Sequence, residues 1–300
     1  MTTVDGPRPA PGKDFMSERT AHRPPPAPDR WRVIWQDTFD GDAGAPPDPE
    51  RWRAVTGSPF GAGVEEHTDD PGHLALDGDG HLRLTATYEA GTGPDGTEGR
   101  YRAAWIETRR EDFVPRPGGA LRIEARVRTA PGSGLDCAMW AWGTQLRHRG
   151  DEDPVQAWYR AGEIDVFEVL GSEPDSVWGA VHSPECHQIP SLGMGGPTTT
   201  GDGSALSDRF HTYAVVWRRD PDSLTWSLDG REYLRLIPED TTPQGWLFHQ
   251  PVFFCLAVII GSPGGPVLPG TPDPSAFPSA LLVDHLTISE ETEPTEGTRA

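Results

Sequence analysis

The stretch LTWSLDGREYLRL, residues 224–236, indicates two short strands joined by a tight turn. Its first half alternates apolar and polar residues, which is the period-two pattern of a half-buried strand. Asp229-Gly230 follows at once, and this dipeptide is a strong short-range signal for a two-residue hairpin turn. The segment therefore predicts a β-hairpin and sets the period to look for elsewhere in the chain.

The same period recurs along most of the sequence. It is found in HLRLTATY (81–88), ALRIEARVRTA (120–130), HTYAVVWR (211–218) and LLVDHLTIS (281–289). In the last of these, Leu282, Leu286 and Ile288 are expected on one face, together with Asp284. VFFCLAVIIG (252–261) is uniformly apolar and too short to cross a membrane, so it predicts a buried strand.

No convincing amphipathic helix of twelve residues is present, and no internal repeat. Many short strands with turn signals predict an all-β fold, a sandwich or jelly roll. We expect one domain over residues 30–290. Residues 1–29, rich in proline and charge, and residues 291–300 are expected to be disordered tails.

Composition excludes several partners. Lys and Arg total 26 against 46 Asp and Glu, which gives a formal net charge of −20. Such an acidic chain is not expected to bind nucleic acid or an anionic membrane surface. We expect a monomer. The cysteines Cys137, Cys186 and Cys255 allow at most one internal disulfide, and the sequence does not say whether it forms.

A second stretch, GEIDVFEVLG (162–171), carries three acids in an otherwise apolar strand. Ionised carboxylates are costly to bury without partners. Residues two apart share a face of a strand, which places Glu163 and Asp165 together. Glu168 would face the other way in a regular strand. A one-residue β-bulge between Asp165 and Glu168 would bring all three carboxyls onto one face.

A retaining glycosidase cleaves a glycosidic bond with two facing carboxyl groups, one as nucleophile and one as general acid/base. A third carboxyl between them can hold one neighbour protonated while the other is ionised. Two other interpretations stay open. The acids can simply be solvated on an edge strand, or they can form a calcium site, since hard cations prefer carboxylate oxygens.

The motif GEIDVFE (162–168) resembles the active-site signature of glycoside hydrolase family 16. The two residues between Asp165 and Glu168 resemble the bulged laminarinase and agarase-like branches, whereas lichenases and xyloglucan-active members have one. The resemblance covers residues 31–289 in order. It runs through WQDTFDG (35–41), HLALDGDGHLRLTA (73–86), FHTYAVVW (210–217), WSLDGREY (226–233) and FPSALLVDHLTIS (277–289).

This resemblance implies a jelly-roll β-sandwich of the concanavalin A-like kind, with an open substrate cleft on its concave face. It implies that Glu163 is the nucleophile, Glu168 the general acid/base and Asp165 the assisting carboxylate. The anomeric configuration would be retained. No cofactor is required by this chemistry.

The resemblance also implies substrate-binding residues around the carboxyls. Trp158, Trp140 and Trp142 would stack on sugar rings, and His182 would bond the catalytic acid or a sugar hydroxyl. Glu66 would be a further acid facing the cleft. For each tryptophan, packing within the protein is the alternative, and a lone histidine is more often structural.

Two further expectations follow from the resemblance. Asp284 would hold a structural calcium ion, as in some members, although a buried hydrogen bond explains it equally well. Family members are usually secreted, yet residues 1–29 hold no apolar core of the kind that a signal peptide needs. We therefore expect no export signal in the sequence as given.

The chain departs from the family pattern at three places. Ala257 stands where an Asn is usual, Val64-Glu65-Glu66 replaces Asn-Asn-Glu, and SPGGP (262–266) replaces a Trp-Pro-Gly loop. These positions shape substrate subsites. The catalytic class implied by the carboxyls is unaffected, while the identity of the polysaccharide is left open.

We therefore expect an endo-acting, retaining glycosidase of a β-linked polysaccharide, first of all a β-1,3-glucan. A transglycosylase would use the same intermediate but pass the sugar to another sugar. A non-catalytic glycan-binding module on the same sandwich is a third hypothesis. The presence of all three carboxyls favours catalysis over the module.

Overall fold

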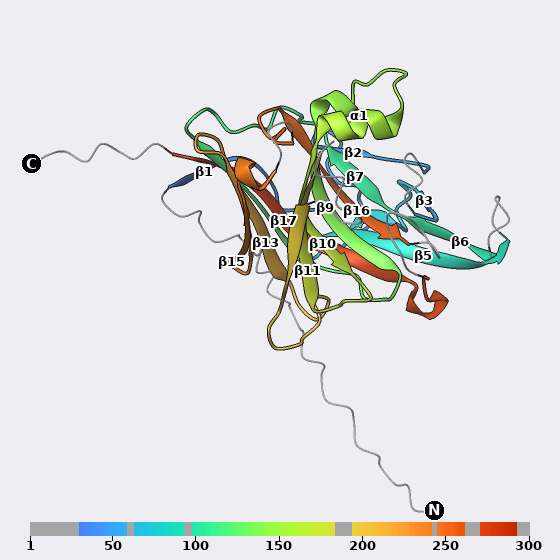
Figure 1. Cartoon of the computed structure of the whole chain (residues 1–300). Helices are drawn as coiled ribbons and strands as arrows, with labels where there is room; N and C mark the ends of the chain where they lie inside the picture. Colours follow the sequence, from blue (N-terminus) through green and yellow to red (C-terminus); the bar gives the residue numbers. More distant parts are fainter. Residues whose placement is uncertain are drawn as a thin grey trace, which may run out of the picture.

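The computed structural model describes residues 30–58, 63–92, 98–183, 194–241, 245–261 and 271–292. Within these ranges the chain is built almost entirely of strands (Figure 1). The strands are β1 (Trp31–Asp37), β2 (Trp52–Ala54), β3 (Glu65–His67), β4 (Leu74–Leu76), β5 (Leu82–Thr92), β6 (Glu98–Ala103), β7 (Trp105–Thr108), β8 (Ala120–Arg128), β9 (Leu135–Gly143), β10 (Glu163–Leu170), β11 (Ser176–His182), β12 (Met194–Thr199), β13 (His211–Arg218), β14 (Ser223–Leu228), β15 (Arg231–Leu236), β16 (Val252–Ile260) and β17 (Ser279–Glu291). One α-helix, α1 (Pro154–Ala161), is described as well.

The strands form two sheets that pack face to face. The larger sheet has the order β15-β14-β13-β8-β17-β5-β6-β3, with β1 added beside β17 and β4 beside β5. The smaller sheet has the order β12-β11-β10-β9-β16-β7-β2. The described pairs are antiparallel except β3 with β6. The prediction of an all-β sandwich is confirmed.

The hairpin from which the fold was predicted is present as β14 and β15. Asp229 and Gly230 have φ angles of 50° and 79°, the positive values that a tight primed turn requires. The alternating apolar residues of this hairpin point into the space between the sheets. Trp226 is 0 % exposed and Leu224 likewise.

The main core lies between the sheets and takes one face of each strand. The residues predicted to share a face on β5, β8 and β13 are all buried in it. Trp217, Trp226, Tyr213 and Phe167 are among its largest fully buried side chains. Because β10 gives its apolar residues to this core, its acids are left for the opposite face, which we call the outer face of the smaller sheet.

The predicted phase of the last strand is wrong in its first half. Leu281 and Val283 are buried in the core, whereas Leu282 is only partly buried. The register with β8 shifts between Val283 and His285, so a β-bulge at Asp284 reverses the alternation. Leu286 and Ile288, beyond the bulge, are buried as expected.

The structure also bears on the predicted end of the domain and on the cysteines. β17 ends at Glu291, one residue into the predicted tail. Arg218 forms a bidentate salt bridge with the Glu291 carboxylate, at 2.7 and 2.8 Å. Cys137 and Cys255 are buried free thiols. Cys186, the stretch SPGGP, residues 1–29 and residues 293–300 lie outside the described residues. No helix in the described ranges is long and apolar enough to cross a membrane.

Candidate active site

A β-bulge in β10 brings its three acids onto the outer face of the smaller sheet. On β9, Glu163 lies opposite Trp142 and Asp165 opposite Trp140. The register then shifts, and Glu168 lies opposite Ala138. The register with β11 shifts at the same place, between Asp165 and Glu168. The bulge predicted from the spacing of the acids is confirmed.

The bulge places two consecutive residues, Val166 and Phe167, in the main core. It also breaks the ladder of backbone hydrogen bonds at this point. The carbonyl of Asp165 accepts a hydrogen bond of 2.7 Å from the indole Nε1 of Trp226, which reaches across the core from the larger sheet. The opposite sheet thus satisfies a backbone group at the centre of the site.

The helix α1 leads directly into the first catalytic candidate. Asp153 caps its start by accepting from the Gln156 amide at 3.0 Å, and Pro154 occupies the first turn, where its missing N–H costs nothing. Gly162 ends the helix with a φ of 70°, and its amide donates to the carbonyl of Trp158. The chain then enters β10 at Glu163.

Trp158, on the last turn of α1, lies over the start of β10. Its indole Nε1 donates a hydrogen bond to Glu163 Oε2. Its ring also packs against His182, with 5.5 Å between the ring centroids. Trp158 remains partly exposed. It therefore contacts a catalytic candidate and still offers part of its ring to solvent.

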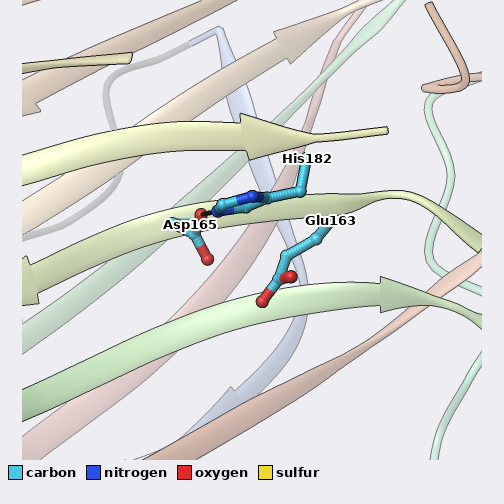
Figure 2. Close-up of side chains that lie close together, drawn as sticks. All are labelled: Glu163, Asp165 and His182. Carbon is cyan, nitrogen blue, oxygen red and sulfur yellow. Dashed lines mark ion pairs between the residues drawn. The ribbon is translucent and has the colours of Figure 1, made fainter. Parts of the chain in front are cut away.

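Asp165 is held by the neighbouring strand. His182 lies opposite Glu163 on β11, and its Nε2 is 3.1 Å from Asp165 Oδ2. Figure 2 shows this imidazole reaching Asp165 with the carboxylate of Glu163 beside them. The structure thus brings four residues that the sequence singled out, Glu163, Asp165, Trp158 and His182, into one connected group.

Burial shifts all three carboxyls toward their protonated forms. Burial and then the charge of Asp165 raise the pKa of Glu163 well above its ordinary value. Burial and then the charge of Glu168 do the same to the pKa of Asp165. Burial raises the pKa of Glu168, and the nearby His182 opposes that rise. Each of the three carboxyls therefore keeps its proton to a higher pH than an exposed carboxyl would.

Trp140 and Trp142 were expected to offer open ring faces, and here the structure differs. They are 4 % and 7 % exposed. Both pack against Trp105 with their rings inclined to it, at centroid distances of 5.2 and 5.6 Å, and residues of α1 cover the cluster. Trp140 and Trp142 form a buried apolar layer beside Glu163 and Asp165. Their part in sugar binding stays a prediction.

Glu66 lies on β3, away from the buried side of that strand. It is exposed, and its carboxylate is 3.7 Å from Arg102. The neighbouring Glu65 points inward instead, is 4 % exposed and accepts a 2.8 Å hydrogen bond from the Ile260 amide. Glu66 lines a surface pocket with Thr56 and other residues of this region. Its role in substrate binding stays a prediction.

The surroundings of Asp284 do not fit the structural calcium ion that the resemblance implied. Its Oδ2 is 2.9 Å from Arg126 Nη1 and 3.1 Å from His285 Nδ1. Burial raises the pKa of Asp284, but these hydrogen bonds outweigh burial and hold that pKa below its ordinary value. The carboxylate is already neutralised by protein side chains, which leaves no charge for a cation.

Among the described residues, one group of three side chains has ligand atoms close enough together for a metal ion. Glu163, Asp165 and His182 each offer an atom within 4.8 Å of the others. These atoms already bond Trp158 and one another. We therefore assign them to the carboxyl site and not to a metal centre.

Sequence reasoning missed two residues of the outer face. Trp178 lies directly opposite Glu168 on β11 and is partly exposed. Asp136 lies on β9, two residues from Ala138, and is 2 % exposed. The signal was available in both cases, because each shares its strand's alternation with a residue that had been placed on this face.

Comparisons with known proteins agree with this geometry. The family model described as "Glycosyl hydrolases family 16" matches residues 119–259, which include β10. A β-glucanase of Rhodothermus marinus is 29 % identical over 272 residues, covering 86 % of this chain and 85 % of the relative. A glucan endo-1,3-β-glucosidase of Cryptopygus antarcticus is 30 % identical over 216 residues, covering 68 % of each chain.

Solved structures give the same result for the fold. An endo-1,3-β-glucanase from Streptomyces sioyaensis superposes with a TM-score of 0.76 at 27 % identity, covering 90 % of this chain and 99 % of its own. The laminarinase from Rhodothermus marinus superposes with a TM-score of 0.70 at 27 % identity, covering 88 % and 98 %. The similarity thus spans both sheets and not the motif alone.

Proposed function

The chain belongs to glycosyl hydrolase family 16, and on that basis we propose that it is an endo-acting hydrolase of β-1,3-glucan that retains the anomeric configuration. The observation that carries this proposal is the bulge, which sets Glu163, Asp165 and Glu168 on one face of β10. Relatives named as endo-1,3-β-glucanases or laminarinases supply the substrate class.

The reaction proceeds in two displacements. In the first, a carboxylate oxygen of Glu163 attacks the anomeric carbon while the bond from that carbon to the glycosidic oxygen breaks. Glu168 gives its proton to the departing oxygen. In the second, water attacks the anomeric carbon, its proton passes to Glu168, and Glu163 leaves as a carboxylate. Two inversions restore the original configuration.

Asp165 makes this division of roles possible. It is more buried than Glu163, at 3 % against 9 % exposure, so it keeps its proton to a higher pH than an exposed aspartate would. A hydrogen bond joins it to Glu163, and His182 holds its other side. The charge of Asp165 raises the pKa of Glu163, and the hydrogen bond lowers the pKa of Asp165, so Glu163 attacks in the state in which the proton of this bond lies on Asp165.

Replacing the nucleophile tests the function directly. Glu163→Gln keeps the shape of the side chain but cannot form the glycosyl ester, so we expect turnover to fall by at least about 10³-fold with a near-native melting temperature. The measurement is release of reducing ends from laminarin, with lichenan, agarose, carrageenan and xyloglucan as further substrates.

Glu89→Gln is the matched control, because Glu89 is an exposed acid on β5 of the larger sheet. It should behave as wild type. Full hydrolytic activity in the Glu163→Gln variant would exclude the proposed nucleophile. Activity on another polysaccharide and none on laminarin would exclude the proposed substrate while leaving the glycosidase intact.

A further inference from the structure

A fourth acid lies on the outer face, on the strand next to the catalytic candidates. Asp136 of β9 pairs with Leu170 of β10 and Ile259 of β16. Since Glu168 pairs with Ala138, Asp136 and Glu168 are diagonal neighbours across the two strands. Diagonal side chains on one face lie within about 7–8 Å at the backbone, a gap that a glutamate can span.

The surroundings of Asp136 disfavour the ionised form of its carboxyl group. Its side chain is 2 % exposed, and its Oδ1 has no hydrogen-bond partner among the described residues. The titratable groups that interact with it electrostatically are Glu168 and Asp165 of β10, Glu65 of β3 and Cys137 of its own strand, which points into the main core. Its neighbour on β16 is the apolar Ile259. No Arg, Lys or His in the described ranges acts on it electrostatically.

A buried carboxylate with acidic neighbours and no cation keeps its proton. Burial and then the charge of Glu168 raise the pKa of Asp136 well above its ordinary value, although a backbone hydrogen bond at Val169 opposes this. Glu168 is less buried and has His182 nearby, so it ionises before Asp136 does. Of the two diagonal acids, Asp136 therefore keeps its proton to the higher pH.

We propose that Asp136 is a positioning residue for the general acid/base, a neutral carboxylic acid whose O–H donates to the carboxylate of Glu168 once that group has lost its proton. The proposal rests on the proposed function. It explains why an atom with no described partner is buried at this place, because the acceptor appears only after the first proton transfer.

A donor that favours the carboxylate makes Glu168 a stronger acid in the first displacement. It also keeps Glu168 oriented as the base for water in the second. The other titratable groups that interact with Glu168 are Asp165 of its own strand, His182 of β11 and Tyr233 of β15. None of them lies on β9.

The test compares two substitutions that cannot ionise. Asp136→Leu removes the donor, while Asp136→Asn keeps one in its amide. The alkaline limb of kcat/KM reports the pKa of the free enzyme's general acid. Measured on laminarin, this limb should move up by roughly one pH unit in Asp136→Leu, because one hydrogen bond to the carboxylate is lost. In Asp136→Asn it should stay in place.

A second substrate separates this role from a structural one. An aryl β-glycoside of a β-1,3-linked gluco-oligosaccharide, with an activated phenol as leaving group, needs no proton from Glu168. On it, kcat/KM of Asp136→Leu should equal that of wild type. Glu65→Gln is the matched control, since it removes another buried acid near Asp136 and should leave the limb unchanged.

Three results would overturn the proposal. A downward shift in Asp136→Asn would mean that Asp136 is ionised. An unmoved limb in Asp136→Leu would mean that Asp136 does not act on Glu168, as would an equal shift in Glu65→Gln. If Asp136→Leu does not fold, Asp136→Ala replaces it. An inactive wild-type enzyme refutes the proposed function itself, which keeps the two failures distinct.

Discussion

The indole N–H of Trp158 donates to Glu163 Oε2, so the charge state of the nucleophile depends on a residue at the end of α1. Burial raises the pKa of Glu163, and this hydrogen bond works against that rise. A nucleophile must be ionised at the working pH. The indole therefore extends the pH range of the enzyme toward acid.

Removing this donor tests its contribution. In Trp158→Phe the ring remains but the N–H is lost, so the pKa of Glu163 should rise. We expect the acid limb of kcat/KM on laminarin to move up by roughly half to one pH unit. Trp246→Phe, which changes a partly buried indole of the main core, is the control and should leave the limb in place. An unmoved acid limb in Trp158→Phe would refute this role.

The face on which each site residue lies could be predicted from the sequence, but its exposure could not. Alternation along β9 correctly places Trp140 and Trp142 beside the carboxyls. It does not say what covers them, because Trp105 comes from β7 and the covering helix α1 has only eight residues, fewer than the twelve sought in the sequence. Exposure on a sheet face depends on such distant segments.

At the scale of the strand, the bulge in β10 needs support from outside its own sheet. It leaves the Asp165 carbonyl outside the regular ladder, and Trp226 of β14 supplies the missing donor. An unsatisfied buried carbonyl would cost about 1–3 kcal/mol. Trp226 therefore couples the packing of the two sheets to the orientation of the carboxyl groups on β10.

A comparison of substitutions at Trp226 and Trp217 distinguishes this coupling from a loss of core packing alone. Trp226→Phe and Trp217→Phe each remove one buried indole hydrogen bond to a carbonyl, of Asp165 at 2.7 Å and of Phe248 at 2.9 Å. Both should cost about 2–4 kcal/mol of unfolding free energy in urea titrations. Only Trp226→Phe should also lower kcat, by roughly tenfold, because a misplaced carboxyl slows both displacements. An equal loss of kcat in both variants would argue against the coupling.

The bulges in β10 and β17 differ in how far the sequence reveals them. In β10 the acids are functional markers whose spacing makes sense only if the alternation is interrupted, so the bulge could be predicted. In β17 the bulge lies at Asp284, whose carboxylate pairs with Arg126 of β8. That partner is distant in sequence, and the apolar residues around Asp284 fit a regular strand equally well, which led to the wrong placement of Leu282.

Over the whole molecule, the site imposes a pH dependence on folding. Glu163, Asp165, Glu168 and Asp136 all have raised pKa values, and burial raises the pKa of Glu65 from 4.5 to about 7. For such acids the unfolded chain releases its proton first. Their contribution to stability is complete below about pH 4 and is lost as the pH rises through the folded-state values.

Glu65 allows this dependence to be measured away from the carboxyls of β10. A rise of its pKa from 4.5 to about 7 corresponds to a penalty on the order of 3 kcal/mol that is absent near pH 4 and complete by about pH 8. Gln at this position keeps an acceptor for the Ile260 amide and carries no charge. Glu65→Gln should therefore match the unfolding free energy of wild type at pH 4.5 and exceed it at pH 8, in urea titrations at both values. Glu66→Gln, one residue away and exposed, should show no such difference between the two pH values. If Glu65→Gln stabilises the protein equally at both, the gain comes from packing, and the buried charge is not what weakens the fold in alkali.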